Sequence, residues 1–334
     1  MAHTKGKKSV FFALIGNTFV TIIKTMVAVL TGSASMFAES VHSFADTLNQ
    51  SLLLVGLKRS KKIADEDHGY GYGIERFFWS LISACGILFI GAGVTVYHSI
   101  TSLLDKDKLY SFNITSVIIL LIALLIESVT LYIAVKELQG KKKFSWNLFE
   151  DDDADPVTLA VVYEDSAAVA GVLVALLAQL LMFLTKNSLY DSVGGIIVGL
   201  ILGFLAIVLI IKNHQYIIGK SINDETQEGI EELLLEDPCV EKIIEFKSVA
   251  VDIGKYRIYT SVEWNGTPLY EEIYRAGELR EEYEEIRNDF GEFTKLMFKM
   301  TDRVPRLVGN HIDEIEKNIR DRFPEVVYVD IEIN

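Results

Sequence analysis

Residues 39–49 read Glu39-Ser-Val-His42-Ser-Phe-Ala-Asp46-Thr-Leu-Asn49, inside an otherwise apolar segment that is long enough to cross a membrane. At about 100° per residue, positions 39, 42, 46 and 49 fall within an arc of roughly 80° on one helix face. Each ionisable group in hydrocarbon costs roughly 2.5–3.5 kcal/mol on insertion scales, so such groups persist where they pair, line a wet cavity or bind a ligand. Two carboxylates, an imidazole and an amide on one stripe predict a cation site. The alternative is a polar stripe that only holds two helices together.

The composition divides the chain into two parts. Of 334 residues, 50% are hydrophobic, yet the formal net charge is −14. Residues 1–212 are poor in charge apart from short basic patches, whereas residues 213–334 are rich in charge. We therefore predict a transmembrane domain at 1–212 and a soluble domain at 213–334. The two cysteines, Cys85 and Cys239, fall in different parts, which predicts free thiols and a reducing compartment for the soluble part.

Apolar runs predict six transmembrane helices, because each run meets the roughly 17–25 residues that cross hydrocarbon. They lie at about 9–30, 35–57, 77–104, 112–138, 157–185 and 190–212.

Basic residues predict the orientation of these spans. One side carries Lys5, Lys7, Lys8, Lys58, Arg59, Lys61, Lys62, Lys136, Lys141, Lys142, Lys143, Lys212 and Lys220, and the other carries Lys106, Lys108 and Lys186. The richer side is the cytosolic side or its matrix equivalent. An even number of spans places both termini and the soluble domain there, in a bacterial inner membrane or an organelle membrane.

The soluble part alternates between helix and strand patterns. The pattern predicts a helix at 224–236 capped by Asp224, strands at 240–251 and 256–264, a helix at 306–322 and a strand at 326–333. This order is close to a ferredoxin-like layout with an acidic helical insertion at about 268–300. The predicted fold class is a polytopic α-helical membrane protein with a C-terminal α+β domain.

Four more ionisable residues lie within the predicted spans. Glu164 and Asp165 are adjacent in the fifth span, so they differ by about 100° and need not face one site. Alternatively, they are first-turn acids that face water. Lys24 and Glu127 predict a mutual ion pair, or a pair between Lys24 and Glu39. A proton relay is the functional alternative.

The sixth span contains Gly195, Gly199 and Gly203 at four-residue spacing, which predicts close packing of helices rather than chemistry. Asp191 opens this span, and we predict that it is an N-cap rather than a ligand.

The loop after the second span reads Asp65-Glu-Asp-His68-Gly-Tyr-Gly-Tyr72-Gly. Carboxylates beside a histidine in a glycine-rich turn predict a weak cation site, although the glycines equally suit a simple turn. No nucleic-acid partner is expected, because there is no P-loop and the soluble part is acidic.

Several of these segments together resemble the cation diffusion facilitator family of divalent-metal transporters. They are Thr31-Gly-Ser-Ala-Ser35, Glu39-Ser-Val-His42 with Asp46, and His68-Gly-Tyr-Gly-Tyr-Gly, within six spans followed by a ferredoxin-like domain. Further segments are similar to the branch that contains the ninth mammalian zinc transporter. They are Glu164-Asp165-Ser-Ala-Ala-Val, Tyr190-Asp191-Ser, Asp330-Ile-Glu332-Ile and the insertion.

The resemblance implies a homodimer that moves zinc, manganese, iron or cobalt by alternating access, commonly against protons. His42 and Asp46 match the family's metal ligands on the second span, and Asp165 matches the aspartate on the fifth. The remaining ligand position is Val161, which cannot bind metal. Glu39, Glu164, Asn49 or water would then complete the set.

Two further metal sites follow from the resemblance with less support. Asp65 and His68 match ligands of a loop site, but Tyr72 stands where a second histidine would be. The soluble part has only His214 and His311, which argues against a histidine-based regulatory site there.

The predicted function is proton-coupled antiport of a divalent cation, with zinc as the expected substrate. Ligands bind metal in their deprotonated form, so protons compete with the metal at His42. Manganese, iron or cobalt efflux is the alternative, as is a membrane metal sensor without transport. An enzyme is not expected, because the chain lacks a paired motif such as H-E-x-x-H. The expected partners are divalent metal cations, protons, membrane lipid and a second copy of the chain, and no cofactor is expected besides the transported ion.

Overall fold

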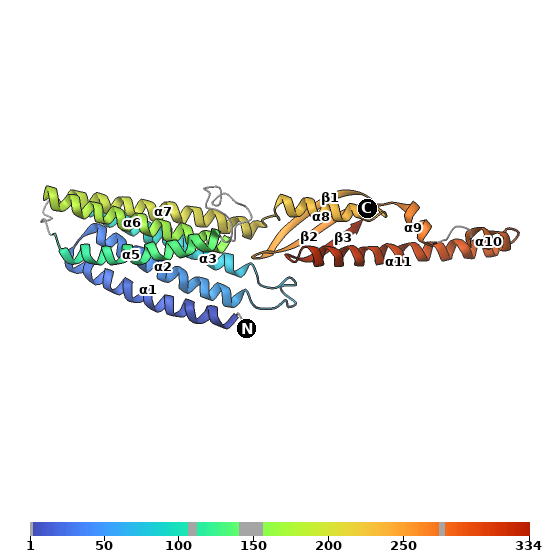
Figure 1. Ribbon diagram of the computed structural model, residues 1–334, viewed down its shortest axis with the longest axis horizontal. Helices are drawn as coiled ribbons and strands as arrows, with labels where there is room; N and C mark the ends of the chain where they lie inside the picture. The colour runs from blue at the N-terminus through green and yellow to red at the C-terminus, as the bar shows by residue number, and fades with distance from the viewer. Residues whose placement is uncertain (1–2, 106–111, 140–155, 274–277) are drawn as a thin grey trace. The chain divides into compact units, whose positions relative to one another are not determined.

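The computed structural model describes residues 3–105, 112–139, 156–273 and 278–334. The chain forms two compact units, Met1–Ile218 and Gly219–Asn334. Helices occupy all six apolar segments of the first unit (Figure 1). They are α1 (His3–Thr31), α2 (Ala34–Arg59), α3 (Glu75–Gly86), α4 (Thr95–Leu104), α5 (Ile114–Gln139), α6 (Pro156–Thr185) and α7 (Leu189–Ile218). A π-helical segment, η1 (Ile87–Val94), joins α3 to α4.

Four helical segments of the described chain are long and apolar enough to cross a membrane. They are Glu75–Leu104, Ile114–Lys136, Val161–Thr185 and Leu189–Ile218. On α5, apolar side chains such as Ile118, Leu121 and Leu125 are exposed, as expected for a helix that faces lipid. Helix α2 is absent from the four, and its polar stripe explains its lower mean hydropathy.

The glycines of α7 allow close packing against η1 and α4. A Cβ atom added at Gly199 would lie 2.7 Å from Val96 Cγ2, and one at Gly203 would lie 3.4 Å from Ala92 Cβ. A Cβ atom at Gly195 would overlap Ser99 Oγ. Because a Cβ atom does not fit at Gly195 or Gly199 without movement of a neighbour, the glycine ridge acts in packing, as its spacing predicts.

The start of α2 is held by a side chain from α7. The Asp191 carboxylate accepts hydrogen bonds from the Ser33 hydroxyl (2.7 Å), the Ala34 amide (2.6 Å) and the Ser35 hydroxyl (2.5 Å). Asp191 is therefore a helix cap, but it caps α2 instead of its own helix. Ser33 adds its own cap by accepting from the Met36 amide (3.1 Å).

The second unit combines a three-stranded sheet with helices. Strands β1 (Val240–Asp252) and β2 (Lys255–Trp264) pair antiparallel, and β2 pairs parallel with β3 (Val326–Ile333), in the order β1-β2-β3. The helices are α8 (Asp224–Glu236), α9 (Gly266–Ile273), α10 (Glu278–Ile286) and α11 (Phe290–Arg322). Helices α8 and α11 pack Ile230, Leu234, Ile315 and Ile319 against strand residues such as Ile258, which forms the core of this unit.

Two predictions for the second unit are wrong in detail. Asn223, not Asp224, is the N-cap of α8, because its side chain accepts from the Thr226 amide (3.0 Å). The last helix begins at Phe290 instead of residue 306, and Pro305 lies inside it. Proline removes one backbone hydrogen bond, but the helix continues on both sides of it.

Some of the residues on which the predictions depend lie outside the described chain. They are Lys106, Lys108 and Lys141–Lys143 of the orientation argument, and residues 274–277 of the predicted insertion.

Candidate metal centre

The stripe on α2 faces the interior of the helical unit. Glu39, His42 and Asn49 are buried, and the side chain of Asp46 is 30% exposed. The Nε2 atom of His42 lies 3.5 Å from Asp46 Oδ2. This nitrogen is buried and has no hydrogen-bond partner. A buried polar atom without a partner is costly, and at a binding site a ligand can supply the missing contact.

Helix α6 presents two carboxylates toward the same region. Glu164 Oε1 accepts a hydrogen bond from Asn49 Nδ2 (2.7 Å). Asp165 lies near Thr130 on α5, whose hydroxyl donates a hydrogen bond to the Glu127 carbonyl (3.0 Å). Asp46 lies close enough to both acids to interact with them electrostatically. The structure therefore brings together His42, Asp46, Asn49, Glu164 and Asp165 from two helices.

These residues do not converge to the spacing of a bound ion. In the part of the chain that the structure describes, only one group of three or more His, Cys, Asp or Glu residues has its ligand atoms all within 4.8 Å of one another. That group lies in the second unit. It consists of Asp237, Cys239 and His311. Val161 is 41% exposed and offers no ligand atom.

Glu39 is engaged in a buried ion triad instead. Lys24 Nζ lies 3.1 Å from Glu39 Oε2 and 3.1 Å from Glu127 Oε1. Both pairs named in the sequence argument are therefore present at once. Gly171 on α6 leaves room for this carboxylate, because a Cβ atom there would lie 2.8 Å from Glu39 Oε1. Since its charge is already compensated by Lys24, Glu39 is a weaker candidate for the fourth ligand than Glu164.

Asp65 contacts other residues of its own loop, between α2 and α3. Its Oδ2 atom lies 2.6 Å from Lys62 Nζ and accepts from the Tyr72 hydroxyl (2.9 Å). The hydrogen bonds from Lys62 and then Tyr72 lower the pKa of Asp65 to about 2. His68 Nδ1 is 3.8 Å from Asp65 Oδ1, and its ring packs on Tyr72. A cation at Asp65 and His68 would have to displace Lys62, so this geometry favours a role in loop closure.

The group of Asp237, Cys239 and His311 is not predicted by the sequence. Cys239 and His311 are 72 positions apart, and no local spacing links them. Only the folding of α11 against the sheet brings them together.

Comparison with known proteins identifies the helical unit. Residues 10–218 match the family described as the cation efflux transmembrane domain. The chain belongs to the cation efflux family. This confirms the resemblance to cation diffusion facilitators, and the protein is an integral membrane protein with several spans. The predicted metal ligands His42, Asp46 and Asp165 lie within the matched region.

Relatives from several lineages align along this cation efflux chain. It is 35% identical over 332 residues to the human "Proton-coupled zinc antiporter SLC30A9, mitochondrial". That alignment covers 98% of this chain and 58% of the human protein. It is 32% identical to "Metal tolerance protein C4" of Arabidopsis thaliana, over 98% of this chain and 73% of the plant protein. It is 25% identical to "Magnetosome protein MamB" of Magnetospirillum gryphiswaldense, over 70% of this chain and 74% of that protein. The chain thus spans less than two thirds of the length of the human relative.

Proposed function

We propose that this cation efflux protein is a proton-coupled zinc antiporter. The observation that carries the proposal is the buried His42 Nε2, which lacks a hydrogen bond and lies 3.5 Å from the Asp46 carboxylate. Acids of α6 lie close to the same carboxylate. The alignment with a protein named as a proton-coupled zinc antiporter supports zinc over manganese, iron or cobalt.

The proposed ligands suit a dehydrated zinc ion. His42 offers a nitrogen, and Asp46 and Asp165 offer oxygens, which are ligand types that zinc accepts in tetrahedral sites. We assign the fourth position to Glu164, because its second carboxylate oxygen remains after Asn49 binds the first. Metal binding would draw α6 toward α2 and shorten the separation of Asp46 and Asp165.

Competition between protons and zinc provides the coupling. The His42 lone pair holds either a proton or the metal, so protonation on one side of the membrane releases zinc there. The cycle requires that the two facing states differ in affinity for the ion. The Lys24 triad beside the site supplies fixed charges that do not bind the ion.

The wider architecture follows the same proposal. We assign all six helical segments as transmembrane spans, residues 1–212 as the transport domain, and residues 213–334 as a ferredoxin-like domain. Both termini are assigned to the cytosolic or matrix side, and the functional unit is assigned as a homodimer. The strand order β1-β2-β3, with two helices packed on the sheet, supports the ferredoxin-like assignment. Light scattering of the purified protein measures the oligomeric state.

Transport is tested with purified protein in sealed liposomes that contain a zinc-sensitive dye. We expect zinc to enter when the liposome interior is acidic relative to the outside, and to enter slowly without the gradient. The same vesicles loaded with dyes for manganese and iron give the selectivity. Zinc binding without any flux would identify a metal sensor and refute the antiporter.

Glu164→Gln tests the fourth ligand. The amide keeps the shape of the side chain and its contact with Asn49, but it removes the charge and weakens metal binding. Because Glu164 is assigned as a direct ligand, we expect zinc flux to fall by about 100-fold, at or above the upper end of the 10–100-fold range for an outer partner of a metal site. The matched control is Glu66→Gln, the same chemical change at an exposed position in the loop between α2 and α3, which should leave the flux unchanged. Equal flux for Glu164→Gln and wild type would leave the fourth position to water.

A further inference from the structure

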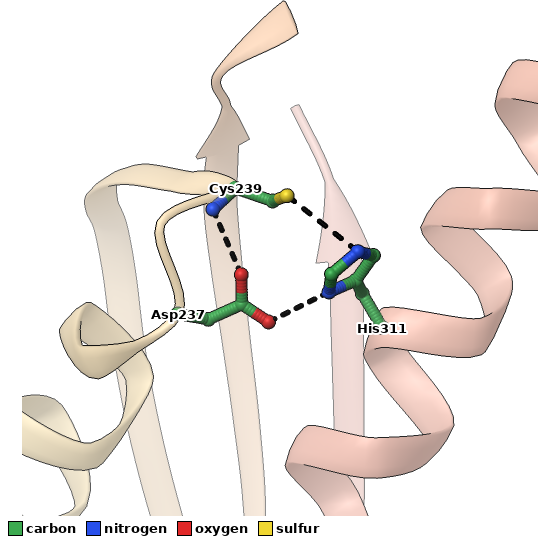
Figure 2. A group of neighbouring side chains, drawn as sticks. All are labelled: Asp237, Cys239 and His311. Carbon is green, nitrogen blue, oxygen red and sulfur yellow. Dashed lines mark hydrogen bonds and ion pairs between the residues drawn. The ribbon is translucent and has the colours of Figure 1, made fainter. Parts of the chain in front are cut away.

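Three side chains that bind transition metals meet at one end of the sheet in the second unit. Asp237 and Cys239 lie in the turn between α8 and β1, and His311 points toward them from α11 (Figure 2). Cys239 Sγ is 3.5 Å from His311 Nε2, and Asp237 Oδ2 is 2.8 Å from His311 Nδ1. The ligand atoms of all three lie within 4.8 Å of one another.

Backbone contacts hold the turn in this position. The other oxygen of Asp237 accepts the Cys239 amide (2.8 Å), as the dashed lines of Figure 2 show. The Cys239 carbonyl accepts the Asn265 amide (2.8 Å), which ties the turn to the end of β2. Cys239 itself is 2% exposed and packs with Leu269 and Val308. The thiol is therefore fixed in place before any ligand arrives.

A fourth candidate ligand comes from α9. Glu272 Oε2 lies 2.8 Å from His311 Nε2, the ring nitrogen that also faces the thiol. The Glu272 side chain is 52% exposed, so it can move by the few tenths of an ångström that a bound ion would require. Asp237 and His311 also line an open surface pocket, which gives ions from solution access to the group.

The spacing fits a zinc-sized ion. With a Zn–S bond of about 2.3 Å, a Zn–N bond of about 2.0–2.1 Å and a tetrahedral angle, sulfur and nitrogen lie about 3.5 Å apart. The distance from Cys239 Sγ to His311 Nε2 is 3.5 Å. Asp237 on the other ring nitrogen would orient the imidazole, as carboxylates commonly do for histidines that bind metal.

Two carboxylates, Asp237 and Glu272, contact the His311 ring beside the thiol, and their negative charge suits a bound cation. Burial, followed by the nearby Asp237 carboxylate, raises the pKa of the Cys239 thiol to about 11. Burial alone would lower the pKa of His311, but hydrogen bonds to Glu272 and Asp237 outweigh it and raise the pKa above its ordinary value.

We propose that Cys239, His311 and Glu272, with Asp237 orienting the imidazole, form a binding site for a thiophilic divalent cation such as Zn²⁺. The ion would connect the α8–β1 turn, α9 and α11. This site is separate from the transport ligands of the helical unit. The scarcity of histidine argues against a histidine-based site in the soluble part, whereas the proposed site needs one histidine together with a thiol and carboxylates.

Cobalt spectroscopy of the full-length protein in detergent tests the site. Cobalt(II) bound to a thiolate gives a near-ultraviolet charge-transfer band, and the proposed transport ligands contain no sulfur. The Cys85→Ser protein retains Cys239 as its only thiol. We expect a saturable band with about one cobalt ion per chain in wild type and in Cys85→Ser. Zinc should abolish the band by displacement.

Matched variants separate this site from the rest of the protein. Cys239→Ser should remove the band, and His311→Gln should weaken cobalt binding at least about tenfold. His214→Gln and Asp46→Asn should keep it, and persistence in Asp46→Asn shows independence from transport. A band that survives Cys239→Ser, or no band in Cys85→Ser at saturating cobalt, overturns the proposal.

A second measurement needs no substitution of the proposed metal ligands, so it does not depend on whether such a variant folds. In the Cys85→Ser protein, zinc should slow alkylation of Cys239 at least about tenfold, and a chelator should restore the rate. An alkylation rate that is the same with and without zinc would refute the site.

Discussion

Asp46→Asn is expected to lower zinc flux into proteoliposomes by about 100-fold or more. Asp46 is the partly exposed carboxylate of the α2 stripe, next to His42, and it lies close to both acids of α6. In the proposed site Asp46 is a direct metal ligand, so loss of its charge should exceed the 10–100-fold effect typical of an outer partner. The initial rate of zinc entry under a fixed proton gradient measures the change.

The control for Asp46→Asn is Asp67→Asn, the same chemical change at an exposed position in the loop between α2 and α3. It should leave the rate unchanged. Both variants should elute like wild type from a sizing column, because Asp46 makes no helix cap. Wild-type flux in Asp46→Asn would show that the stripe only packs helices.

Lys24→Met is expected to destabilise the helical unit by about 3–5 kcal/mol, the cost of breaking a buried ion pair by removing one partner. Lys24 and Glu39 are both fully buried, and Lys24 is the cation between two carboxylates. Without it, Glu39 and Glu127 remain as close like charges. The fraction of protein that stays monodisperse in detergent after heating measures the loss.

The variant Lys24→Met/Glu39→Gln/Glu127→Gln separates lost packing from unpaired charge. It removes all three charges, so it should recover most of the stability that Lys24→Met loses. A triple variant as unstable as Lys24→Met would mean that the lysine side chain acts through packing alone.

The α2 stripe could be predicted from the sequence because helical periodicity alone places positions 39, 42, 46 and 49 on one face. Strands β1 and β2 could also be predicted from the sequence, because alternating apolar residues and the turn at Gly254 define them locally. Glu39 shows the limit of this reasoning. Periodicity places its side chain on the correct face, but only the packing of α1 and α5 shows that Lys24 and Glu127 occupy its carboxylate.

Contacts between distant segments could not be predicted in this way. The position of Asp191 at the start of a helix predicts a helix cap, yet the groups that donate hydrogen bonds to it lie more than 150 positions away at the start of α2. Cys239 and His311 likewise carry no shared motif. The sequence predicts each element, and the tertiary fold decides which elements supply one site.

The cap from Asp191 also limits which helices of the first unit can move relative to one another. Asp191 on α7 accepts four hydrogen bonds from the start of α2, so these two helices should move as one rigid body in the proposed transport cycle. Among the described residues, α6 is joined to α2 and its N-cap by the hydrogen bond from Asn49 to Glu164 (2.7 Å) and by a longer one from Gln179 to Ser33 (3.4 Å). The sliding surface would then lie between α6 and the α2–α7 pair, with the ion ligands divided across it. Each passage of an ion would break and remake the contact at Asn49 while the clamp at Asp191 stays closed.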